Sequence, residues 1–92
     1  MARIIVERSH SLGRQAAREK AEQLAAKLAR DYGVNCEWQG DVLAVRRSGA
    51  DGRIEVEDSR VKVSLKLGLL LSAMGASIQS QIERALDKAL QA

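Results

Sequence analysis

Two kinds of apolar spacing follow each other along the chain, and they predict where it forms strands and helices. Ala2–Arg8 is a short run with β-branched side chains at its centre, which is typical of a strand. From Leu12 to Tyr32 apolar positions recur every three or four residues, which lines up one face of a helix. Gly33 follows, and glycine favours the left-handed conformation that commonly ends a helix. The chain therefore begins with a strand and then a helix.

The next segment reads as a hairpin. Residues 34–39 alternate apolar and polar side chains, which is the pattern of a half-buried strand. Gly40 and Asp41 suit a two-residue turn that leads into a further strand at Val42–Arg47.

Two more strands and a second helix complete the predicted order. Ser48–Gly52 has the composition of a longer turn before a strand at Arg53–Glu57. Arg60–Leu67 alternates most regularly, so one face of its sheet should lie in water. Apolar residues spaced from Ile78 onwards predict a helix that runs to the C-terminus.

This order predicts one α+β domain, residues 1–92, in which both helices cover one face of a five-stranded antiparallel sheet. The core must be filled by Leu, Ile, Val and Ala, because the chain has no Phe, one Trp and one Tyr. Such a core is thin, which makes leucines that fall outside it informative.

Charge and composition exclude several classes of protein. The net charge is +3, but the two signs are interleaved and aromatic residues are scarce, so we expect no nucleic-acid binding. We expect no secretory signal and no transmembrane segment, because no apolar run approaches the required length. A single cysteine cannot form an internal disulfide. These features together predict a cytoplasmic protein.

The stretch that precedes the first helix gathers the only histidine, two serines and two arginines. Its structural interpretation is a helix entry, in which the Ser11 hydroxyl caps the first turn. Its functional interpretation is an anion site at the helix N-terminus. The residues of that site are Arg8, His10, Ser11, Gly13 and Arg14.

We predict no catalytic residue, no metal site and no cofactor. Cys36 alternates with Val34 and Trp38, which is typical of a small buried thiol, and His10 is the only imidazole that could activate it. The acidic residues near the turns do not match the spacing of a calcium loop, and one Cys with one His is too few for zinc.

The run that follows Gly68 has more apolar residues than one buried face can hold. We predict an apolar contact surface made by Leu69, Leu70, Leu71, Met74 and Ile78. Three interpretations remain open: a junction that seals the core, the seam of a homodimer, or a surface that touches an apolar partner.

Four stretches of the sequence resemble one known family. They are residues 8–33, "WQGD" at 38–41, "DGRIEVED" at 51–58 and "VSLKLGLLLSAMG" at 63–75. Together they resemble the small bacterial polyhydroxyalkanoic acid system proteins, also described as granule-region proteins. The resemblance implies an association with the synthesis, storage or use of polyhydroxyalkanoate, an intracellular storage polyester, and it brings no catalytic residue with it.

We therefore expect a non-enzymatic accessory or binding protein, present as a homodimer, that acts through apolar contacts with a polyhydroxyalkanoate granule surface or a granule protein. Arg60, Lys62 and Lys66, on the wet face of the sheet, would be available to an acidic partner. The alternative is a binding module for an acyl or hydroxyacyl ligand. It would hold its ligand between sheet and helices, with the anion site at the first helix N-terminus.

Overall fold

A computed structural model gives the structure of residues 2–90. The predicted order of strand, helix, four strands and helix is confirmed, with one additional short helix before the last one. The elements are β1 (Ala2–Ser9), α1 (Arg14–Tyr32), β2 (Asn35–Gln39), β3 (Val42–Arg47), β4 (Ala50–Val56), β5 (Arg60–Leu67), α2 (Leu69–Ser72) and α3 (Gly75–Ala89).

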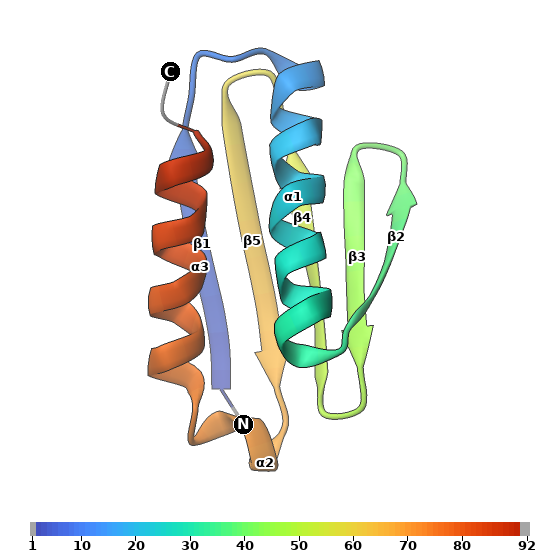
Figure 1. The fold of residues 1–92 in the computed structure, drawn as a ribbon, viewed down its shortest axis with the longest axis vertical. Helices are drawn as coiled ribbons and strands as arrows, with labels where there is room; N and C mark the ends of the chain where they lie inside the picture. The colour runs from blue at the N-terminus through green and yellow to red at the C-terminus, as the bar shows by residue number, and fades with distance from the viewer. Residues whose placement is uncertain (1, 91–92) are drawn as a thin grey trace.

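The five strands form one antiparallel sheet, as predicted, and their order in the sheet is β1-β5-β4-β3-β2. The chain leaves β1 at one edge, crosses through α1 and enters β2 at the opposite edge. It then returns strand by strand until β5 pairs with β1. Figure 1 shows α1 and α3 side by side on one face of the sheet, with α2 at one end of the molecule. No helix within residues 2–90 covers the other face, which we call the open face.

The core lies between the two long helices and the sheet, and it is aliphatic. In β5 the burial alternates as predicted, so that Val61, Val63, Leu65 and Leu67 face the helices. The helices present matching stripes of buried residues, which are Ala17, Ala21, Leu24, Ala25, Leu28, Ile78, Ile82 and Leu86. A void of about 10 Å³ lies beside Leu28, Ile54 and Ile82. A space of that size is about the minimum for one water molecule.

Helix α1 begins two residues later than predicted, and Ser11 does not cap it. Gly13 is the N-cap residue, with φ of 84°, and no side chain bonds to the first turn. The Gly13 carbonyl instead accepts from the N–H of Ala17 at 3.0 Å. The positive φ explains the correction, because a glycine takes this conformation without the strain that serine would feel. The predicted end is confirmed: Gly33 is left-handed, with φ of 69°.

The hairpin at Gly40 and Asp41 is confirmed, but the following turn is shorter than predicted. Ser48 and Gly49 alone reverse the chain, and β4 already begins at Ala50. Gly49 supplies the positive φ, 85°, that a tight turn between two strands needs. The glycine at position 52, interpreted as part of the turn, lies instead inside a strand.

Candidate functional site

The short helix α2 and the turn after it form an apolar protrusion, which we call the tip: Leu69, Leu71, Ala73 and Met74. Its base is fixed by two glycines, because the Gly68 N–H donates to the Gly49 carbonyl at 2.7 Å. A Cβ on Gly68 would lie 3.3 Å from that carbonyl oxygen, so a larger residue would push the two turns apart. The Ser72 hydroxyl donates to the Gly68 carbonyl at 2.8 Å and holds the single helical turn.

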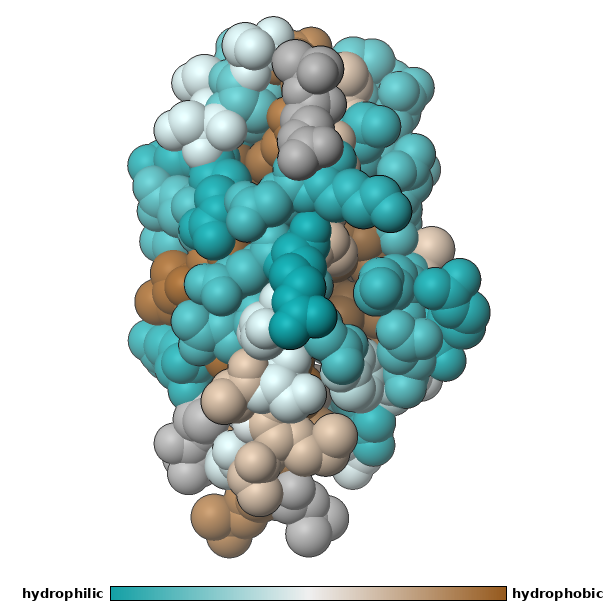
Figure 2. Space-filling view, turned by 60° about the vertical axis from the view of Figure 1, so that its left-hand side comes forward, coloured by the Kyte–Doolittle hydropathy of each residue, from teal (hydrophilic) through white to brown (hydrophobic). Residues whose placement is uncertain are grey.

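The tip exposes apolar side chains that the core does not need. Leu69 is 82% exposed and Met74 is 46% exposed, whereas Leu71 is half-buried and packs against the core. Figure 2 shows apolar residues gathered at the lower end of the molecule, while most of this side is hydrophilic. An isolated exposed Leu is ordinary, but adjoining exposed Leu, Met and Ala residues on a protruding turn form an unpartnered apolar patch.

The structure divides the five residues predicted for this surface. Leu69 and Met74 lie on it, and Leu71 forms its base. The side chain of Leu70 lies outside the described part of the structure. Ile78 must be removed from the predicted surface: it is only 3% exposed, because α3 begins at Gly75 and turns this side chain towards the sheet.

The structure does not bring together the cations predicted for an anion site. Arg8 points away from the start of α1, and its Nε donates to Asp87 Oδ1 on α3 at 2.7 Å. This hydrogen bond raises the pKa of Arg8. Arg14 lies 3.5 Å from Asp41 and 3.6 Å from Asp58. Gly13 and Ser11 are exposed. Arg8 is thus hydrogen-bonded to Asp87, and Arg14 is ion-paired with Asp41 and Asp58.

His10 joins two loops instead of facing a ligand. Its Nδ1 accepts from the Leu12 N–H at 3.1 Å, and its Nε2 lies 3.1 Å from the Glu57 carbonyl oxygen. Because a carbonyl oxygen only accepts, Nε2 carries the proton and both ring nitrogens are occupied. The imidazole therefore fastens the entry of α1 to the turn between β4 and β5.

Replacing His10 with alanine should lower the free energy of unfolding by about 1–2 kcal/mol, since it removes both of these hydrogen bonds. Denaturant unfolding measures the change. Ser11→Ala is the matched control and should stay within about 0.5 kcal/mol, because no side chain caps this helix. A loss at Ser11 as large as that at His10 would contradict the corrected helix entry.

Cys36 is exposed, in contrast to the buried thiol predicted from the alternating pattern. It lies on the edge strand β2, where only one side of the thiol is shielded by α1, and Sγ is 3.8 Å from the Ala25 carbonyl oxygen. Desolvation on that side raises the pKa of the thiol above its ordinary value, which disfavours the thiolate. His10 follows the opposite edge strand, so no imidazole activates this thiol.

Sequence reasoning missed the cluster that fastens the β2–β3 hairpin to α1. The Arg18 guanidinium lies 3.9 Å from the centroid of the Trp38 ring and donates to Asp41 at 3.0 Å. The Trp38 indole N–H donates to Glu22 at 2.8 Å. Arg18 and Glu22 are four residues apart in the sequence and so lie on one helix face. Only the register of the hairpin shows that both contact Trp38.

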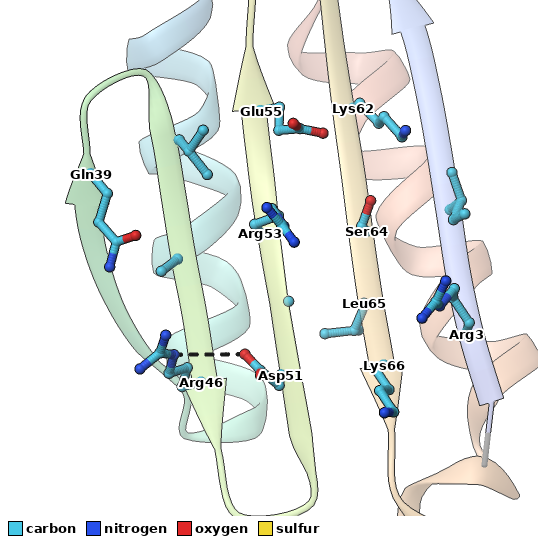
Figure 3. Close-up of a pocket in the computed structure, with 14 residues that line it drawn as sticks. Arg3, Gln39, Arg46, Asp51, Arg53, Glu55, Lys62, Ser64, Leu65 and Lys66 are labelled. Carbon is cyan, nitrogen blue, oxygen red and sulfur yellow. Dashed lines mark ion pairs between the residues drawn. The ribbon is translucent and has the colours of Figure 1, made fainter.

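The open face holds a shallow hollow of about 640 Å³. Figure 3 shows its polar lining, to which Lys62 and Lys66 contribute from β5. Neither lysine makes an ion pair with a described residue. Arg60 was also expected to be available to an acidic partner, but it already donates to Glu57 at 2.6 Å and to Glu7 at 3.0 Å. The hydrogen bond to Glu57 raises the pKa of Arg60.

Comparison with known proteins places this fold in one family. Across residues 2–90, no helix has the length and hydropathy needed to cross a bilayer. Neither the curated proteins nor the solved structures gave a match. The family model of the putative polyhydroxyalkanoic acid system proteins matches residues 4–90, which is nearly the whole chain. The chain therefore belongs to the family of putative polyhydroxyalkanoic acid system proteins.

Proposed function

We propose that this protein is a non-enzymatic, cytoplasmic accessory of polyhydroxyalkanoate metabolism that binds an apolar surface through its tip. The family name supports the association with polyhydroxyalkanoate systems. The observation that carries the mode of action is the 82% exposure of Leu69 on a helix of only four residues. In this proposal the tip contacts the apolar surface of a polyhydroxyalkanoate granule or of a granule protein.

The energetics of the tip favour such a contact. Fully burying a Leu or Met side chain stabilises a complex by about 1.5–3 kcal/mol. Leu69 and Met74 are exposed in the isolated chain, so a large part of this stabilisation becomes available only when a partner covers them. The tip is held at its base by backbone hydrogen bonds, so presenting these side chains costs little additional ordering.

The positions of the two most reactive side chains support a non-enzymatic role. His10 bonds through both ring nitrogens, and Cys36 lies at the other edge of the sheet with a raised pKa. No group of three or more metal-ligating side chains occurs within residues 2–90. Nucleophilic catalysis needs a nucleophile within hydrogen-bond distance of its base, and these two residues lack that arrangement.

The packing between sheet and helices does not favour the alternative function, an acyl-binding module. Pockets that hold small molecules usually measure about 300–1,000 Å³. The void beside Leu28, Ile54 and Ile82 measures about 10 Å³. An acyl chain could enter this space only if α1 or α3 moved away from the sheet.

Replacing Leu69 and Met74 together with serine should weaken binding to polyhydroxyalkanoate particles by about 2–4 kcal/mol, which is 30-fold or more. Co-sedimentation isotherms measure this change. The control is Ile5→Ser, because Ile5 is 51% exposed on the open face, away from the tip. We expect Ile5→Ser to bind within about twofold of the unaltered chain and both variants to remain folded. Equal binding by all three proteins would overturn the proposal.

The same surface could instead join two copies of the chain, which is the homodimer predicted from the sequence. Burying two copies of the tip against each other would cover Leu69 and Met74 in both chains. Light scattering after size exclusion separates the two uses. A dimer that the Leu69→Ser/Met74→Ser variant converts to a monomer, without particle binding by either protein, would assign the tip to the dimer seam.

A further inference from the structure

The end of the molecule that carries the tip has more basic than acidic residues. This end contains the start of β1, the end of β5, the β3–β4 turn with its flanking residues, and the last six residues of α1 (Figure 1). It holds six of the 15 basic residues but only two of the 12 acidic ones, which leaves nine basic and ten acidic residues elsewhere. The eight residues are Arg3, Lys27, Arg30, Arg46, Arg47, Lys66, Asp31 and Asp51. The tip end therefore has a net charge of +4, while the rest of the chain has −1.

Ion pairing sharpens this asymmetry. All of the ion pairs of 3.0 Å or shorter among residues 2–90 lie away from the tip. They are Arg8–Asp87, Arg18–Asp41, Arg60–Glu7 and Arg60–Glu57. At the tip end the two acidic residues make longer pairs, Arg30–Asp31 at 3.6 Å and Arg46–Asp51 at 3.7 Å. The positive charge of the tip end is thus largely uncompensated within the described part of the chain.

Two of these cations lie beside each other on the open face, next to the tip. Arg3 of β1 is paired in register with Lys66 of β5, and both side chains are exposed. Figure 3 shows them on neighbouring strands, where β5 leaves the sheet towards α2. Lys66 precedes Leu69 by three residues, so the two cations lie at the end of the sheet from which the tip protrudes. Neither Arg3 nor Lys66 makes an ion pair with another residue in the range 2–90.

We propose that the tip end binds an apolar layer that carries anionic headgroups, such as the surface of an anionic phospholipid layer. This inference rests on the proposed function, because it takes the tip as the point of contact. Leu69 and Met74 would enter the apolar layer, while Arg3 and Lys66 would remain at headgroup level, since long cationic side chains keep their charge in the polar zone. Each such cation near an anionic surface strengthens binding by about fivefold.

A nucleic acid fits this surface less well. Phosphate groups would satisfy the cations, but they would leave Leu69 and Met74 in water. Stacking on bases requires exposed aromatic rings. Trp38 already stacks under Arg18, and Tyr32 is half-buried, with its hydroxyl bonded to Gln81. The combination of exposed apolar and unpaired cationic groups therefore favours an anionic amphiphile.

Vesicle co-sedimentation of the full chain tests the inference directly. The protein should bind phosphatidylcholine vesicles that contain phosphatidylglycerol at least tenfold more tightly than vesicles of phosphatidylcholine alone. Added salt should reduce this difference, because exposed charges are screened. Equal affinity for both vesicles, with Leu69→Ser/Met74→Ser weakening both, would overturn this inference and leave the proposed function standing. No binding to vesicles or to polyhydroxyalkanoate particles would overturn both.

Two matched double variants locate the charge effect. Arg3→Gln/Lys66→Gln removes two cations beside the tip, and it should weaken binding to the anionic vesicles by about 25-fold. Arg53→Gln/Lys62→Gln removes the same charge from the same open face, and Lys62 lies on β5 about 13 Å further from the tip than Lys66. This control should weaken binding by less than about threefold.

Two results would contradict the assignment. An equal loss in both double variants would mean that only the net charge matters. Binding of a short DNA duplex that is lost in Arg3→Gln/Lys66→Gln, without any vesicle binding, would assign these cations to a nucleic acid instead.

Discussion

Replacing Ile54 with alanine is expected to lower the free energy of unfolding by about 4 kcal/mol. Ile54 is 0% exposed in the central region of the sheet, under α1. Its side chain packs among the buried aliphatic residues of the core, and such neighbours relax only partly into the space left by a truncation. Thermal unfolding should show a midpoint lowered by about 15 °C or more.

Ile5→Ala is the matched control for this prediction. It is the same truncation on β1, but the side chain is 51% exposed on the open face. We expect a loss below about 1 kcal/mol, since little apolar area is returned to water. Similar losses at the two positions would show that the open face is covered, for example by a second copy of the chain.

Replacing Gly52 with alanine is expected to destabilise the fold by about 2–3 kcal/mol through overpacking. Gly52 lies opposite Leu65 in the β4–β5 register, and the side chain of Leu65 occupies the space next to it (Figure 3). A Cβ at position 52 would collide with the backbone oxygen of Ser64 and lie 2.8 Å from Leu65 Cδ1. Because one of these obstacles is backbone, a change of rotamer cannot relieve the collision.

The neighbouring substitution Arg53→Ala serves as its control. Arg53 is exposed on the open face, so denaturant unfolding should change by no more than about 0.5 kcal/mol. Unaltered stability of Gly52→Ala would mean that β4 and β5 are further apart at this point than the structure shows.

The sequence predicted the elements whose signals are local. The alternation in Arg60–Leu67 identified β5 and its buried face, because the period of two is a property of the strand itself. Gly33 and Gly40 were predicted as the end of α1 and the β2–β3 turn, and both have positive φ. The side of the sheet covered by the helices also followed from the pattern, since apolar stripes on the helices and the strands must face each other.

The features that the sequence did not predict depend on tertiary contacts. Cys36 follows the alternating pattern, yet it is exposed because β2 is an edge strand and α1 shields it on one side only. Gly52 lies in a segment with the composition of a turn, but it is paired with Leu65 inside the β4–β5 ladder. Arg8 was grouped with the start of α1 because it is near in sequence, whereas its partner Asp87 is 79 residues away.

The candidate site was predicted in part, for the same reason. An excess of leucine after Gly68 is visible in the sequence, and the structure places Leu69 and Met74 at the surface. Ile78 was grouped with these residues because it is apolar and close in sequence. Its side chain is buried in the core, because it lies on the face of α3 that packs against the sheet. The positive charge around the tip was not predicted, because basic and acidic residues are mixed along the sequence. The basic residues around the tip lie at one end of the molecule only because the strands pair as they do.

Amide hydrogen exchange with and without polyhydroxyalkanoate particles tests the central claim most directly, since it locates the contact without any substitution. The account predicts slower exchange of the amides in residues 68–76, because α2 is a helix of only four residues at the surface and its amides open more readily than those of the core. Residues 10–13 and 57–60, which lie at the opposite end of the molecule, should exchange at unchanged rates (Figure 1). Protection of that opposite end or of the open face, with residues 68–76 unaffected, would contradict the account.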